Sequence, residues 1–139
     1  MIINETLRLY PAAVSTLRQS DKPVKLGNIS IPTGTQLHIP ILQTHHDPTW
    51  WGNDANEFNP GRFSEGIGKA AKHPLAYTPF GFGPRICVGR DFALLEAKLV
   101  LAVFLQRFSF VTSPSYAHAP MFLFTLQPQH GAQVILKIN

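Results

Sequence analysis

The sequence feature that most constrains the fold of this chain is a ten-residue segment, Phe80 to Gly89, with the sequence Phe-Gly-Phe-Gly-Pro-Arg-Ile-Cys-Val-Gly. It contains the single cysteine of the chain, Cys87. An almost wholly apolar stretch, from about Arg90 to Arg107, follows it and is predicted to be a helix. A sulfur just before the N-terminus of a helix gains from the helix dipole and from unpaired backbone N–H groups, which stabilise a thiolate. The segment therefore predicts a loop that presents a thiolate ligand.

The other residues of this segment fit the same chemistry. Gly81, Gly83 and Gly89 permit tight turns and the close approach of a flat ligand, which a side chain would block. Phe80 is expected to close the loop over the sulfur and to exclude water, since the groups around a metal ligand tune the metal. The alternative for a lone cysteine is an inert buried thiol. With one cysteine, no internal disulfide is possible.

The segment resembles the haem-binding loop of cytochromes P450, F-x-x-G-x-R-x-C-x-G, with every specified position filled. The matching residues are Phe80, Gly83, Arg85, Cys87 and Gly89. The resemblance implies haem b (iron protoporphyrin IX) as the cofactor and Cys87 as the axial ligand of its iron. Arg85, two residues before the sulfur, is then expected to form a charge-assisted pair with a haem propionate.

Two further motifs agree with the first. Glu5 and Arg8 lie three residues apart on one face of the expected N-terminal helix and resemble the E-x-x-R of the family's K helix. Phe58 to Phe63 resembles the family's P-E-R-F segment, whose arginine, here Arg62, joins the other two in a buried triad, although Gly61 stands where that motif usually has glutamate. Loss of one member of a buried charge network typically costs roughly 3 to 5 kcal/mol. The resemblance therefore assigns these residues to folding and haem retention rather than to catalysis.

Three weaker correspondences concern the haem surroundings. Arg18, in the strand expected after the first helix, stands where many members place a propionate-binding arginine, and an exposed strand arginine is the alternative. The resemblance also implies that Ala13 to Leu17 and the hairpin near Met121 to Phe124 overhang the haem and contact substrate. Their apolar character fits a lipophilic substrate, and it fits a plain core nearly as well.

The residue pattern predicts a mixed α+β chain. One helix is expected from Met1 to Tyr10, where Pro11 ends it, and the helix from Arg90 to Arg107 is apolar on every side, which predicts deep burial. An ordered loop region pinned by aromatic residues is expected from His45 to Ala76. The predicted strands, which suggest a small antiparallel sheet and further tail strands, are Val14 to Leu17, Val24 to Leu26, Ile29 to Ile31, Gln36 to Ile41 and alternating segments between Phe108 and Asn139.

Charge and composition exclude other classes. The net charge of +4 is scattered without a basic run or a nucleic-acid module, so no nucleic-acid binding is expected. His45-His46-Asp47 invites a metal-site interpretation, but adjacent side chains rarely converge on one ion and no spaced ligands accompany them. Four cations flank the cysteine loop and the following helix, and they form either a patch for an acidic flavoprotein or ordinary solvated side chains. They are Lys69, Lys72, Arg90 and Lys98.

The resemblance covers the whole chain and is greatest to the clan of membrane-bound plant P450s that hydroxylate hormones and other isoprenoids. It implies a parent monooxygenase that inserts one oxygen atom from O2 into a lipophilic small molecule. Electrons would come from NADPH through a flavoprotein cytochrome P450 reductase, at the cytosolic face of the endoplasmic reticulum membrane. Residues 1–139 would be the C-terminal haem-binding part of a single, mostly α-helical domain. The oxygen-activating helix and the membrane anchor are expected before Met1, so this chain alone is expected to be inactive.

Two alternatives stay open at this point. The first is a truncated, non-catalytic remnant with weak or no haem binding. The second is a haem-thiolate lyase or isomerase that uses no O2, as some plant relatives do. The spacing from Phe80 to Cys87, which contains no insertion, favours a monooxygenase over the second alternative.

Overall fold

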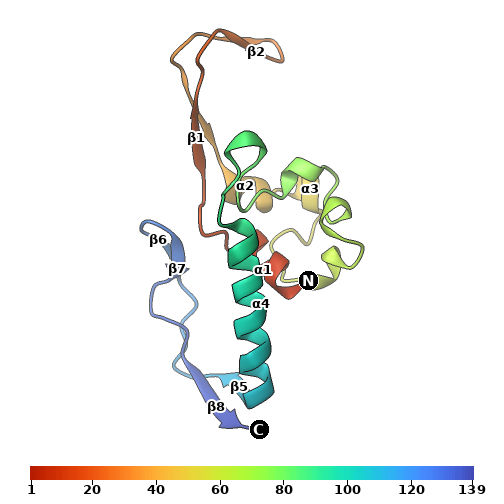
Figure 1. The fold of residues 1–139 in the computed structure, drawn as a ribbon, viewed down its shortest axis with the longest axis vertical. Helices are drawn as coiled ribbons and strands as arrows, with labels where there is room; N and C mark the ends of the chain where they lie inside the picture. The colour runs from red at the N-terminus through yellow and green to blue at the C-terminus, as the bar shows by residue number, and fades with distance from the viewer.

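The computed structural model describes all of residues 1–139 and shows an elongated chain of helices and short strands (Figure 1). Helix α4 runs along the long axis, with one long hairpin near its start and the C-terminal strands beside it and at its far end. The mixed α+β class predicted from the sequence is confirmed, and so are the residues of the long helix. The helices are α1 (Ile2–Leu9), α2 (Ile41–His45), α3 (Pro48–Trp51) and α4 (Arg90–Arg107), with 3-10 turns η1 (Pro60–Phe63), η2 (Ile67–Lys69), η3 (Pro74–Ala76) and η4 (Gly83–Arg85).

The strands form four separate two-stranded antiparallel sheets. β1 pairs with β4 and β2 pairs with β3, so that β2 and β3 form the tip of one long hairpin. Gly27, at a φ of 56°, supplies the left-handed backbone that turns the chain between β2 and β3. In the C-terminal part β5 pairs with β8, and β6 pairs with β7. The strands are β1 (Thr16–Gln19), β2 (Val24–Leu26), β3 (Ile29–Ile31), β4 (Gln36–Ile39), β5 (Phe108–Thr112), β6 (Pro120–Phe122), β7 (Leu126–Pro128) and β8 (Val134–Ile138).

The packed core lies between α3 and the 3-10 turns that follow it. α3 begins where it does because the Asp47 carboxylate accepts a hydrogen bond from the Thr49 N–H at 2.8 Å, and Pro48 takes the first helical position. The start of α3 at Pro48 places Trp51, the second tryptophan of the helix, in the core. The buried cluster consists of Trp51, Ala55, Phe63 and Ala76.

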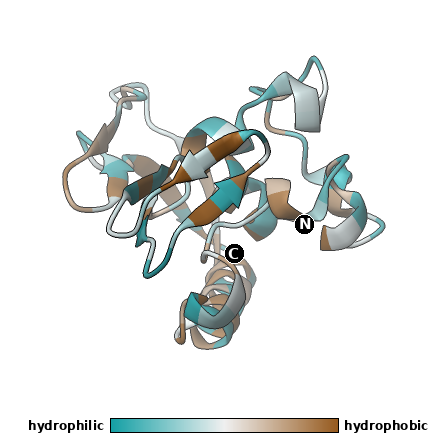
Figure 2. Ribbon diagram, turned by 90° about the horizontal axis from the view of Figure 1, so that it is seen from above, coloured by the Kyte–Doolittle hydropathy of each residue, from teal (hydrophilic) through white to brown (hydrophobic).

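The deep burial predicted for α4 is wrong for this structure. Apolar residues lie around the helix, which Figure 2 views along its axis, yet none of its residues is buried. Phe92 is 71% exposed, Leu95 66% and Leu99 62%. The main contacts of α4 within the chain are with α1 and β5, so no second layer of this chain covers its faces. None of the helices is long and apolar enough to cross a membrane.

Two strand predictions differ from the structure at their ends. The first strand begins at Thr16 rather than Val14, because Thr16 is paired with Ile39, the last residue of β4. The fourth strand ends at Ile39 rather than Ile41, because Pro40 has no N–H to continue a ladder. The chain turns there into α2, a helix that the sequence pattern did not predict.

Candidate functional site

The cysteine loop, residues 80–89, joins the core region to α4. The Cys87 N–H donates to the Phe80 carbonyl at 2.9 Å, which ties the two ends of the loop together. Gly81 and Gly83 have φ values of 75° and 73°, in the left-handed region that side chains rarely adopt, so they set the turn of the loop. Cys87 is thereby held just before the first residue of α4, with its thiol exposed.

A cleft of about 330 Å³ opens beside the cysteine loop. Phe80, Gly81, Arg85 and Cys87 form its loop side. The facing side comes from α1, the segment that leads into β1, β1 itself and the start of α2, and it is mostly apolar. The sulfur therefore faces an open, largely apolar space bounded by two separate parts of the chain.

Two arginines line this cleft together with the sulfur. Arg85 comes from the loop itself, and Arg18 comes from β1 on the facing side. The side chains of β1 alternate, so that Thr16 and Arg18 are half-buried while Leu17 is 60% exposed. Arg18 Nη1 donates to Thr16 Oγ1 at 2.7 Å and to the Leu17 carbonyl at 2.8 Å, which holds the guanidinium close to its own strand.

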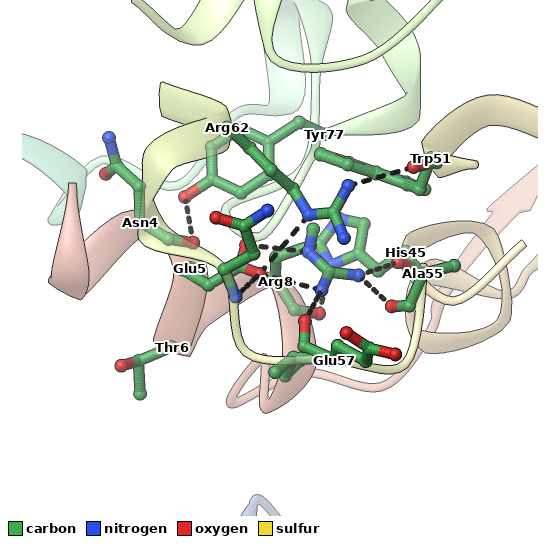
Figure 3. A network of polar contacts seen from close by, with 12 residues as sticks. Asn4, Glu5, Thr6, Arg8, His45, Trp51, Ala55, Glu57, Arg62 and Tyr77 are labelled. Carbon is green, nitrogen blue, oxygen red and sulfur yellow. Dashed lines mark hydrogen bonds and ion pairs between the residues drawn. The ribbon is translucent and has the colours of Figure 1, made fainter. Parts of the chain in front are cut away.

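Glu5, Arg8 and Arg62 meet in a buried ion network outside the lining of the cleft (Figure 3). Arg8 Nε donates to Glu5 Oε2 at 2.8 Å, and Arg8 Nη2 donates to Glu5 Oε1 at 2.9 Å. Both side chains are fully buried, and this bidentate pair has the geometry of the strongest charge-assisted hydrogen bonds. Arg62 Nε lies 3.5 Å from Glu5 Oε1. The structure thus brings together three residues that the sequence places up to 57 positions apart.

Arg8 also ties the surrounding loops to α1. Its Nη1 donates to the carbonyls of His45 at 2.7 Å and Ala55 at 2.5 Å, and its Nη2 donates to the Glu57 carbonyl at 3.0 Å. With the two bonds to Glu5, every one of the five guanidinium donors is used. One buried side chain therefore fixes α1 against α2 and against the segment after α3.

The Glu5 carboxylate is held in its charged form. Burial alone raises its pKa, but hydrogen bonds from Arg8 and from the Asn59 N–H, together with the charges of Arg8 and Arg62, outweigh burial and lower the pKa below 4.5. Arg62 has a second carboxylate partner, because its Nη2 lies 2.5 Å from Asp54 Oδ2. Arg62 also donates to the Trp51 carbonyl at 3.0 Å, which joins the ion network to the apolar core.

The three residues of the His45-His46-Asp47 segment have different local partners in the structure. His45 is buried, His46 lies 2.7 Å from Asn56 Oδ1 and 3.0 Å from the Leu9 carbonyl, and Asp47 caps α3. No group of three or more His, Cys, Asp or Glu side chains is placed to hold a metal ion. Sequence reasoning missed the buried role of His45. The available signal was its spacing of four from Ile41, which puts both on the buried face of α2.

The cations near the loop are partly occupied by local partners. Lys69 Nζ lies 3.1 Å from Glu65 Oε2, and Arg90 Nε lies 2.7 Å from Asp91 Oδ1, both at exposed positions. The Asp91 hydrogen bond and charge raise the pKa of Arg90, and they lower that of Asp91. Two of the four cations considered as a docking patch are thus already paired within the chain.

Comparison with known proteins matches this arrangement to one family along nearly the whole chain. Residues 1–136 match the family model described as Cytochrome P450. A cyanobacterial structure, described as retinoic acid bound CYP120A1, superposes with a TM-score of 0.87 at 30% sequence identity and covers 99% of this chain and 32% of that chain. The fold and the order of its elements are therefore those of the matched family.

Curated relatives from plants are similar at higher identity. Cytochrome P450 72A397 of Kalopanax septemlobus is 57% identical over 136 residues, which are 98% of this chain and 26% of the relative. The 11-oxo-beta-amyrin 30-oxidase of Glycyrrhiza uralensis is 59% identical over the same shares of the two chains. The chain thus spans about a quarter of the length of the curated relatives it matches.

Proposed function

This chain belongs to the cytochrome P450 family, and from that membership we propose that it forms the haem-ligating face of a monooxygenase, with Cys87 as the axial thiolate ligand. The single observation that carries the proposal is the exposed sulfur of Cys87 on a glycine-turned loop, facing a mostly apolar cleft. A thiolate at this position gains from the dipole of α4, which follows directly.

The residues present fit a haem. A Cβ built on Gly83 would meet nothing within 4 Å, and one built on Gly81 would meet only the Arg85 carbonyl at 3.9 Å, so the loop surface is open to a flat ring. Apolar residues of the facing wall suit a porphyrin, and the two guanidinium groups suit its acidic propionates. We assign Arg85 and Arg18 to the propionates, and Phe80, Gly83 and Gly89 to the loop that holds the sulfur.

Each part of the chain has a distinct task in this proposal. A bound haem supplies the chemistry of O2 activation, and the chain supplies binding, orientation and one anionic ligand. The buried network of Glu5, Arg8 and Arg62 holds α1, α2 and the segment after α3 in place. It touches neither haem nor substrate in this assignment, so its role is retention of the fold and of the cofactor.

We propose a lipophilic small molecule as the substrate, O2 as the co-substrate, and a flavoprotein reductase that passes on electrons from NADPH. The name of one relative, 11-oxo-beta-amyrin 30-oxidase, supports oxidation of a triterpenoid-like substrate. The exposed apolar residues Phe122, Leu123 and Phe124 of the β6–β7 hairpin support a lipophilic ligand. We place the parent enzyme at the endoplasmic reticulum membrane.

The proposal is tested by haem reconstitution and absorption spectroscopy. The purified chain is loaded with haemin, reduced and treated with carbon monoxide, and the expected result is the long-wavelength Soret band of a thiolate-ligated haem. Cys87→Ser should abolish that band. Val88→Ala is the matched control. The Val88 side chain, next to Cys87, is fully exposed, so its truncation should leave the band unchanged. A Cys87→Ser protein that retains the band would overturn the assignment of the ligand.

A further inference from the structure

His45 is a buried histidine whose two ring nitrogens both have backbone partners. Nε2 lies 3.0 Å from the Thr78 N, and Nδ1 lies 3.0 Å from the Arg8 carbonyl oxygen. Because the Thr78 amide is a donor, Nε2 must accept and carries no proton. Nδ1 therefore carries the proton and donates it to the Arg8 carbonyl. The contacts define one neutral tautomer.

The His45 ring packs against two aromatic side chains, Tyr77 and Trp51, which Figure 3 also labels. It stacks on Tyr77 with ring centroids 5.6 Å apart and meets the Trp51 ring edge-on at 6.4 Å. The His45 carbonyl accepts from Arg8 Nη1 at 2.7 Å, so these two residues bond to each other in both directions. The ring therefore connects the buried ion network, through Arg8, to Thr78.

Thr78 lies two residues before the cysteine loop. The Thr78 carbonyl accepts from the Gly81 N–H at 2.9 Å, and the Phe80 carbonyl accepts from the Cys87 N–H at 2.9 Å. Pro79, between them, has no N–H to offer. The Thr78 N–H therefore fixes the start of the loop, and His45 Nε2 is its acceptor.

We propose that His45 is a positioning residue, which sets the cysteine loop against α1 through its hydrogen bonds to Thr78 and Arg8 and so places the Cys87 sulfur in the cleft. The part of this proposal that concerns the haem rests on the proposed function. The part that concerns the loop stands on the contacts of the chain alone. The ring acts through the backbone and touches neither the sulfur nor the cleft.

A pair of amide variants separates the two bonds of the ring. In His45→Gln the side-chain amide reaches the position of Nε2, so it can accept from Thr78. In His45→Asn the amide reaches only the position of Nδ1, so it can bond to the Arg8 carbonyl but not to Thr78. His45→Phe keeps an aromatic ring on Tyr77 and removes both bonds. His46→Phe is the matched control, because His46 also bonds to α1 but not to Thr78.

The first measurement is hydrogen exchange of the Thr78 amide in the full chain. The exchange rate at Thr78, relative to the amides of α1, is expected to rise at least tenfold in His45→Asn and His45→Phe. His45→Gln should restore part of the protection. His46→Phe should leave it unchanged. A general loss of stability would raise exchange at all these amides together. Equal exchange at Thr78 in the Gln and Asn variants would overturn the proposal. This comparison decides even if the Phe variant does not fold.

The second measurement is the carbon monoxide spectrum of the haem-loaded variants. The long-wavelength Soret fraction is expected to fall in His45→Asn relative to His45→Gln, because the sulfur is no longer held at one position. If the unsubstituted chain shows no such band, the proposed function fails, while the exchange experiment still decides the role of His45. If the band is present and equal in both variants, positioning of the sulfur by His45 is wrong.

Discussion

At the scale of single residues, Arg8 bonds to four residues in three parts of the chain through the five N–H groups of one side chain. It reaches Glu5 in its own helix and the carbonyls of His45, Ala55 and Glu57 outside it. A lysine could not replace it, because an ammonium group cannot provide this planar, fork-shaped set of donors. The stability of this region therefore depends on one guanidinium group.

Removal of that group should be strongly destabilising. Arg8→Met leaves the Glu5 carboxylate buried without its main partner, which typically costs about 3 to 5 kcal/mol of unfolding free energy. Urea unfolding followed by circular dichroism measures the loss. Lys69→Met, which breaks an exposed pair of the same chemical kind, is the control and should change the midpoint little. Similar midpoints for the two variants would contradict a structural role for the buried network.

His45 should make the chain less stable in mild acid. Burial, followed by the charges of Arg8 and His46, lowers its pKa from 6.5 to about 4, although its hydrogen bond to the Arg8 carbonyl opposes the shift. Between these pH values the unfolded chain binds a proton that the folded chain does not, so stability rises with pH across this window. The total effect is on the order of 3 kcal/mol.

Urea unfolding at a series of pH values tests this expectation. His45→Gln has no titrating ring and should flatten the slope between pH 6.5 and about 4. A separate loss below pH 4.5 should remain, because the pKa of Glu5 is lowered in the folded chain and its stabilising charge disappears as the pH falls through that value. Tyr77, which stacks on His45, does not titrate in this range, and burial and the Glu5 charge raise its pKa further. An unchanged slope in the variant would assign the acid sensitivity to other groups.

The two arginines of the cleft should each strengthen haem binding. Arg85→Gln and Arg18→Gln remove one charge-assisted partner of a propionate and should weaken haem affinity by roughly tenfold each. Lys25→Gln is the control, because it removes an exposed positive charge in β2, outside the cleft. Titration with haemin measures the affinities. Affinities unaffected by both arginine variants would remove these residues from the proposed site.

How far the sequence determines the site depends on the kind of residue. The spacing of Glu5 and Arg8 by three predicts a shared helix face, and the structure has both side chains on it. The partnership with Arg62 was suggested only by family resemblance, because no local pattern links positions so far apart. The burial of His45 could have been predicted from its spacing of four from Ile41, but its hydrogen bonds could not, since its partners Arg8 and Thr78 come from distant segments.

At the scale of elements, periodicity predicts helices better than it predicts what covers them. The bounds of α4 follow from its composition and from the loop glycine before it. Its burial does not, because burial is a property of the surrounding layers rather than of the helix. The ends of the strands are also hard to predict, because the pairing of β1 with β4 decides which residues belong to each strand.

The exposure of α4 predicts a contrast between two leucines. Leu9, at the end of α1, is 4% exposed, and its replacement by alanine should cost about 2 to 5 kcal/mol. Leu99, in α4, is 62% exposed, and the same replacement should change stability by no more than about 0.5 kcal/mol. Chemical unfolding of both variants measures the difference. Equal losses would show that α4 is covered in solution, for example by a second copy of the chain.

At the scale of the whole molecule, order is concentrated in one region. Twelve of 139 residues are buried, and they lie mainly in α1, α2, α3 and the turns after them. Outside this region the chain consists mainly of two-stranded sheets and an uncovered helix, and an isolated pair of strands is marginally stable in water. The cysteine loop joins the two regions, so its geometry depends on the ordered side, through Thr78.

A core substitution should therefore loosen the two regions unequally. Phe63 is 4% exposed in the aromatic core, and Phe63→Ala should lower the unfolding free energy of that core by about 3 to 5 kcal/mol. Hydrogen exchange should then rise at the amides of α1, α2 and α3. Amides of the β6–β7 hairpin already exchange fast in the unsubstituted chain by this argument, and they should hardly change. If exchange instead rises by the same factor along the whole chain, the molecule unfolds as a single cooperative unit, and the hairpins owe their order to the core as well.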